Sequence, residues 1–185
     1  MLKEKFEEFL KQKEKEKSDS PEIDWEQQKK EWLLFLSQLY KIFEDALKEY
    51  RDSVKTSYSE IPINEEYIGT YKAKVMAIKI FNEEIKLKPI GTNLIGAKGR
   101  VDMSGRLGSA KLVLVDARKK SIRDHIKVSI KKLADEIDSK EEPEKKNRKP
   151  IEWEWRFISS PPARLYQPVN EETILSAIME LVNVS

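Results

Sequence analysis

The apolar residues between Trp25 and Tyr50 recur with the spacing of an α-helix, and Asp24 precedes them as a capping residue. One face of this helix carries Trp25, Trp32, Leu36, Leu39, Phe43, Ala46 and Tyr50. Residues 32–36 are all apolar, and successive helical residues lie ~100° apart, so they cannot all face one sheet. We therefore predict a long helix over 24–50 whose inner stripe is Trp32, Leu36 and Leu39. We expect Phe35 to lie toward a flank, covered by the first helix or by a second chain.

A two-residue period replaces the helical one from Tyr58 to Val115. It predicts strands over 67–81, 85–89, 101–103 and 111–115, with a connection at 61–64 and a polar turn at 82–84. A further alternation over 151–157 predicts a strand with core-facing side chains at Ile151, Trp153, Trp155 and Phe157. The connections are too short for crossover helices, so the sheet should be antiparallel.

Three other segments have a helical pattern. A thin apolar stripe predicts a charged helix over 2–17, and regularly spaced isoleucines with a leucine predict a second helix over 118–138. The third is the C-terminal helix, which Asn170 should cap. Residues 139–150 hold two prolines and no apolar residue, which is typical of a flexible loop.

These elements predict an α+β fold. We expect an antiparallel sheet of about four to six strands, packed against the long N-terminal helix and the C-terminal helix. Residues 1–20 should form a charged helical arm, and 21–185 a single domain that includes the loop 139–150.

The amino-acid composition excludes several kinds of catalytic and metal-binding site. The 185 residues include no cysteine and one histidine, His125, which excludes thiolate chemistry, disulfides and multi-histidine metal sites. Asp124 cannot orient His125, because adjacent helical residues do not face each other. We predict no catalytic residue, metal or cofactor, and we expect a protein that is not an enzyme. An enzyme would have to use lysine, arginine or carboxylate chemistry.

Charge and hydropathy set the expected location. The 35 basic and 33 acidic residues give a net charge of +2, which provides no overall cationic field for nucleic acid. The N-terminus lacks the apolar stretch of a signal peptide, and no run approaches the ~18 apolar residues of a membrane span. We expect a cytoplasmic protein that does not engage membranes.

Two glycine-rich turns, 96–99 and 105–108, carry the main candidate site. The first does not match a phosphate-binding loop, because Ala97 separates Gly96 from Lys98 and Gly99 stands where the hydroxyl residue is needed. Flexible turns with several cations could nevertheless bind a phosphate or an acidic protein surface. The cations are Lys98, Arg100, Arg106 and, just after the turns, Lys111. Alternatively, Arg100 pairs with Asp102 on the same side of one strand.

The function that best fits this pattern is a non-catalytic protein-binding or assembly module, such as an adaptor or an inhibitor-like accessory protein. Its binding residues would be Phe35 on helix 24–50 and the cations Lys98, Arg100, Arg106 and Lys111, and its partner another protein or a second copy. The alternative is nucleic-acid binding through Lys98, Arg100, Arg106 and the basic flank of helix 118–138.

Overall fold

The computed structural model describes residues 5–8, 11, 24–92, 97–118, 151–159 and 165–182. The predicted helix 118–138 and the loop 139–150 therefore lie almost wholly outside the described residues, as does most of the helix 2–17; residues 5–8 are helical.

In the described part of the chain, the sheet is antiparallel and has seven strands in sequential order, rather than the four to six expected. The strands are β1 (Val54–Glu65), β2 (Gly69–Ile80), β3 (Glu83–Gly91), β4 (Gly99–Gly105), β5 (Gly108–Asp116), β6 (Trp153–Ile158) and β7 (Tyr166–Pro168). Within the described residues, each pairs only with its neighbours in sequence, so these strands form an open meander with β1 and β7 at its edges. The α+β class is confirmed.

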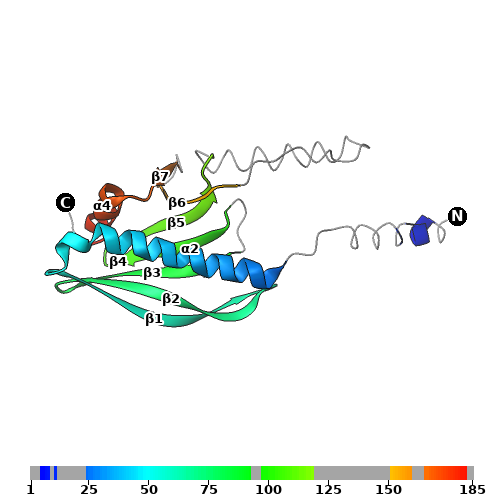
Figure 1. Cartoon of the computed structure of the whole chain (residues 1–185), viewed down its shortest axis with the longest axis horizontal. Coiled ribbons are helices and arrows are strands. Elements are labelled where there is room, and N and C mark those ends of the chain that lie inside the picture. Colours follow the sequence, from blue (N-terminus) through cyan, green and yellow to red (C-terminus); the bar gives the residue numbers. More distant parts are fainter. Residues whose placement is uncertain are drawn as a thin grey trace.

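Two helices lie on one face of this sheet and contact each other (Figure 1). Helix α2 (Trp25–Ala46) starts where predicted, with Asp24 Oδ1 accepting a hydrogen bond from the Gln27 amide at 2.9 Å. It ends four residues earlier than expected, and a 3₁₀ turn, η1 (Lys48–Tyr50), follows. Asn170 caps α4 (Glu171–Val182) as predicted, because its side chain accepts from the Thr173 amide at 3.0 Å.

The core lies between α2, α4 and the sheet. Trp32, Leu36 and Leu39 are buried as predicted, and Phe35 is half-buried at the flank. Ile151 is exposed and precedes β6, so its predicted place in the core was wrong. Across the sheet, the core also includes Met76, Ile78, Ile85, Leu87, Val101, Met103, Leu112, Leu114, Trp155 and Phe157.

Strand β2 changes the face that it buries partway along its length. Tyr71 and Ala73 face the core in its first half, and Met76 and Ile78 do so in its second half, while pairing with β1 stays continuous. Pairing with β3 covers only residues 76–80 of β2. The first half of β2 therefore turns away from β3 together with β1. Strand β2 begins at Gly69 (φ +79°), two residues later than the strand predicted over 67–81.

The β2–β3 connection is the two-residue turn Phe81–Asn82, whereas the sequence predicted a polar turn at 82–84. Phe81 has φ +50°, the one positive value among the described non-glycine residues, and its side chain is 76% exposed. A bulky side chain in this left-handed region strains the backbone.

We expect Phe81→Gly to raise the free energy of unfolding by about 1 kcal/mol, because glycine adopts positive φ without strain and no buried contact is lost. Urea denaturation measures the change. Asn82→Gly is the control, and it should give no gain, since Asn82 does not need positive φ. An equal gain from both variants would contradict the strain at Phe81.

Candidate functional site

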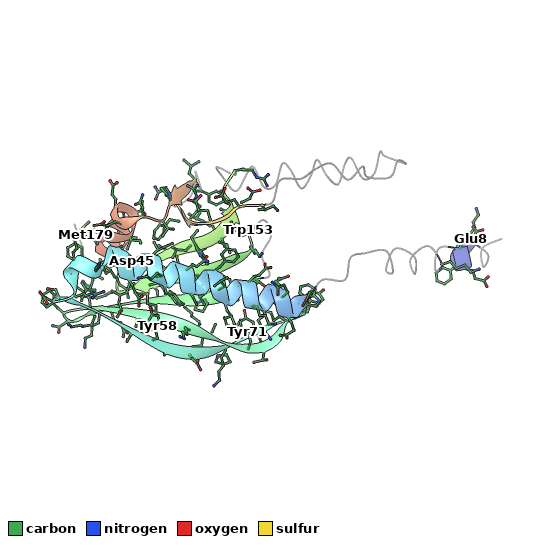
Figure 2. The ribbon with its side chains drawn as sticks, viewed as in Figure 1. Glu8, Asp45, Tyr58, Tyr71, Trp153 and Met179 are labelled. Atoms are coloured by element: carbon green, nitrogen blue, oxygen red, sulfur yellow. The ribbon has the colours of Figure 1, made fainter. Side chains whose placement is uncertain are left out.

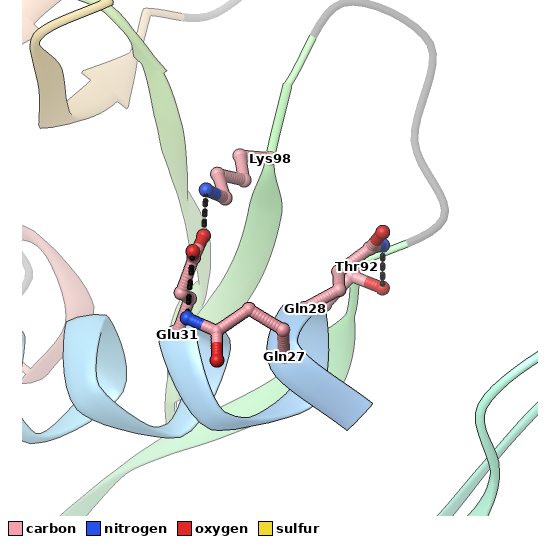
Figure 3. Close-up of polar contacts among 5 residues, drawn as sticks. All are labelled: Gln27, Gln28, Glu31, Thr92 and Lys98. Carbon is pink, nitrogen blue, oxygen red and sulfur yellow. Dashed lines mark hydrogen bonds and ion pairs between the residues drawn. The ribbon is translucent and has the colours of Figure 1, made fainter. Parts of the chain in front are cut away.

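Lys98 lies in the first glycine-rich turn, directly before β4, and its side chain reaches back to helix α2. Its ammonium forms an ion pair with Glu31, which also accepts a hydrogen bond from Gln27 Nε2 at 3.1 Å (Figure 3). The hydrogen bond from Lys98 is the main cause of the lowered pKa of Glu31. Lys98 therefore joins β4 to α2.

The flank of α2 that carries Phe35 is covered by residues of the same chain. The Lys98 ammonium lies 5.4 Å from the centre of the Phe35 ring and 5.1 Å from that of Trp153, a distance that allows cation–π attraction. The Phe35 carbonyl also accepts a hydrogen bond from Trp155 Nε1 at 3.0 Å. Phe35 thus has contacts within the chain on the side where a partner was expected.

The position directly after Lys98 requires a glycine, Gly99. A Cβ at this position would lie 2.1 Å from Cζ3 of Trp32, far inside van der Waals contact. Any side chain would therefore push the helix away from β4. The glycine is needed for close packing of α2 on the sheet.

Arg100 pairs with Asp102, which was the alternative considered from the sequence. Its Nε and Nη2 each donate to the Asp102 carboxylate at 2.6 Å. Both residues lie on the face of the sheet opposite α2, since the intervening Val101 faces the core. Lys111 stands opposite Asp102 in the β4–β5 ladder, and its side chain is exposed.

Arg106 and its turn hold the end of helix α4. Arg106 donates to Glu83 at 3.0 Å and to the Val182 carbonyl at 3.1 Å, while the Leu107 amide donates to the Leu181 carbonyl at 3.0 Å. These bonds satisfy carbonyls that a helix C-terminus leaves unpaired. A Cβ on Gly105 would lie 2.7 Å from the Leu181 oxygen, so glycine allows this approach.

The predicted cations therefore do not form one site. Lys98 faces α2, Arg100 lies on the opposite face of β4, and Arg106 is at the far end of that strand. Gly99 and Gly105, one from each glycine-rich turn, are positions of close contact with α2 and α4.

We expect Arg106→Ala to lower the free energy of unfolding by about 1 kcal/mol, because it removes one exposed ion pair and one bond to a helix-terminal carbonyl. Arg106→Lys should recover part of the loss, since lysine restores the charge without the planar fork. Chemical denaturation of both variants tests this. No change in Arg106→Ala would mean that Leu107 alone caps α4.

A buried carboxylate, missed in the sequence, joins three strand ends beneath α2. Glu65 is 9% exposed and accepts hydrogen bonds from the Tyr71 hydroxyl at 2.5 Å and from the Thr92 amide and hydroxyl at 2.8 Å each. Burial, and secondarily Glu65, raises the pKa of Tyr71. Gln28 of α2 extends the network to Thr92 at 3.2 Å (Figure 3). The network bridges β2 and β3 where their pairing has ended.

An open hollow of about 370 Å³ lies between the C-terminal part of α2 and the start of β1. Two of its cations are not paired with a carboxylate of the described chain: Lys55 Nζ donates to the Arg51 carbonyl at 2.8 Å, and no described carboxylate lies within ion-pair distance of Arg51 or Lys55. The lining residues are Lys41, Glu44, Leu47, Arg51, Val54, Lys55 and Thr56.

Comparisons with protein-family models, curated proteins and solved structures find no match for this chain. Within the described ranges, no three histidine, aspartate or glutamate side chains gather as metal ligands would. None of the described helices is long and apolar enough to cross a membrane.

Proposed function

We propose that this protein is a non-catalytic protein-binding or assembly module, and that its binding surface is helix α2 together with the adjoining edge of the sheet. The observation that carries the proposal is the open edge of β1. This strand is 12 residues long and, among the described strands, pairs with β2 alone. Every second residue of an edge strand directs its N–H and C=O away from the sheet, where another strand can pair with them.

The sequence of β1 leaves most of this edge available. Pro62 lacks a backbone donor, but residues 54–61 contain no proline. The side chains from Lys55 to Glu60 are exposed. Native proteins usually cover or shorten such an edge, so a long open one favours strand pairing with a partner.

Helix α2 contributes to this surface through the flank that faces β1. Tyr58, which Figure 2 labels, lies on β1 beside α2. It packs against Tyr40 of α2, with ring centres 5.7 Å apart, and its hydroxyl donates to Glu44 at 2.8 Å. The other flank, with Phe35, is contacted by Lys98 and Trp155. This supports the β1 side of α2 as the site of partner contact.

A photo-crosslinking amino acid at Ser59 of β1 tests the proposal in cells of the native host. Ser104, exposed on the interior strand β4, is the matched control position. We expect protein adducts of discrete mass from position 59 and few from position 104. Similar yields at both positions would contradict the proposal, as would adducts that a nuclease removes.

A proline variant then tests strand pairing itself. Along β1, N–H groups that bond to β2 alternate with N–H groups that point away from the sheet. Of the two variants Thr56→Pro and Ser57→Pro, one therefore removes an outward-pointing donor and leaves the β1–β2 hydrogen bonds intact. The variant that keeps the wild-type melting temperature should lose the adducts at position 59. Their persistence would show that the partner does not pair with β1.

Nucleic-acid binding, the alternative from the sequence, gains no specific support from the described residues. Lys98, Arg100 and Arg106 are each held in an ion pair, and they lie in three different places. The basic flank of helix 118–138 lies outside the described part of the chain.

A further inference from the structure

We infer that the partner of the β1 edge is an extended peptide segment rich in carboxylates, whose acidic side chains enter the hollow at the start of β1. This inference rests on the proposed function, because it names the chemistry of the partner that pairs with β1. It combines two features of the same place: an open strand edge and a cluster of cations beside it.

The hollow lies at the edge of β1 rather than on one face of the sheet. Val54, Thr56 and Tyr58 point toward α2, since Val54 packs on the core and Tyr58 contacts Tyr40. Lys55 is on the opposite side of the strand, yet it also lines the hollow and bonds to the Arg51 carbonyl. A strand added along β1 would therefore pass directly by these residues.

The charges around the hollow favour an anionic occupant. It is lined by three cations, Lys41, Arg51 and Lys55, and by one carboxylate, Glu44. Lys41 is paired with Asp45 at 2.7 Å, and Glu44 accepts from Tyr58, so both are already occupied. Arg51 and Lys55 have no described carboxylate in contact and remain the cations that a partner can neutralise.

Peptide carboxylates fit this site better than phosphates of nucleic acid. Strand addition requires a partner with its own backbone N–H and C=O groups. Nucleic acid would instead need aromatic side chains free to stack on bases. Tyr58, two residues along β1 from Thr56 of the hollow, is packed against Tyr40 and hydrogen-bonded to Glu44. A bidentate bond from Arg51 to a carboxylate would give both orientation and affinity.

The probe is a fluorescein-labelled octapeptide of alternating glutamate and valine, with the lysine–valine octapeptide as its counterpart. Binding to the full chain is followed by fluorescence anisotropy. We expect the glutamate peptide to bind, with an affinity that falls as salt is added, and the lysine peptide not to bind. Equal binding of the two peptides would overturn the inference.

Charge reversal locates the binding. Arg51→Glu with Lys55→Glu should weaken the glutamate peptide at least about tenfold, because attraction becomes repulsion at contact distance. Lys86→Glu with Lys88→Glu on β3 changes the net charge equally, and should weaken binding by less than about twofold, since exposed charges beyond ~10 Å are screened. Equal losses in the two variants would mean that the peptide senses only overall charge, and would overturn the inference.

The remaining measurements distinguish a failure of this inference from a failure of the proposed function. If the proline variant of β1 that keeps the wild-type melting temperature loses binding of the glutamate peptide, the inference is supported. If that variant still binds the peptide, the inference is overturned. The inference is also overturned if a single-stranded oligonucleotide binds at the same hollow more tightly than the peptide does. It is likewise overturned if the protein forms a dimer that the proline variant dissociates. If Arg51→Glu with Lys55→Glu leaves the crosslinks at Ser59 unchanged, the acidic partner is wrong while protein binding at β1 stands.

Discussion

Trp32→Ala is expected to lower the free energy of unfolding by ~3–5 kcal/mol, the usual range for removing a buried aromatic side chain. Trp32 is fully buried where α2 crosses the sheet, and its ring lies 6.0 Å from that of Trp155. Its removal leaves a cavity between Gly99 and α2 that the neighbouring backbone cannot fill. Urea denaturation followed by circular dichroism measures the loss.

Phe35→Glu is the matched comparison on the same turn of α2. Its side chain is half-buried, and a glutamate there can reach the Lys98 ammonium, so we expect a loss of only about 1–2 kcal/mol. The hydrogen bond from Trp155 is made to the Phe35 backbone and should persist. A loss as large as that of Trp32→Ala would mean that Phe35 belongs to the core and not to the flank.

The sequence predicted the elements whose burial leaves a periodic pattern. Helix α2 and strands β3 and β6 bury residues at regular intervals, and each was located within a few residues. Strand β5 was located as well, although its residues 112–116 are all buried. Strand β1 was missed because none of the side chains from Val54 to Ile61 is fully buried, and those from Lys55 to Glu60 are exposed on both faces. An edge strand needs no alternation, so the strand that we propose as the binding surface carries the weakest sequence signal.

The candidate site was harder to predict, because it depends on contacts between distant residues. Nothing near Gly99 in the sequence indicates that Trp32, far earlier in the chain, lies against it. Likewise, the Glu65 network joins residues from two separate connections. Cations beside glycines therefore suggested a flexible anion site, whereas Arg100 and Arg106 are each used within the fold. The pairing of Arg100 with Asp102 was the exception, since their spacing on one strand places them on the same side.

Gly99→Ala should be as damaging as the loss of a large core side chain, at about 3 kcal/mol or more, although it adds one methyl group. The new Cβ would lie 2.1 Å from Trp32 Cζ3 and 2.5 Å from its Cε3, and the ring has no exposed surface toward which to move. Gly108→Ala is the control, because its Cβ would meet nothing closer than Leu181 Cδ2 at 4.0 Å. That variant should be neutral or slightly stabilising, since alanine reduces the freedom of the unfolded chain.

The double variant Gly99→Ala with Trp32→Ala identifies the contact directly. Once the indole is absent, the methyl group introduced at position 99 enters the space it vacated, so the double variant should be no less stable than Trp32→Ala alone. The two changes should therefore be non-additive by about 3 kcal/mol, the upper end of couplings between touching residues. Gly105→Ala clashes with Leu181 instead, and its cost should add to that of Trp32→Ala within about 0.5 kcal/mol. If the cost of Gly99→Ala survives the removal of Trp32, the glycine is required by the β4 backbone itself, and the packing of α2 on β4 is not what selects it.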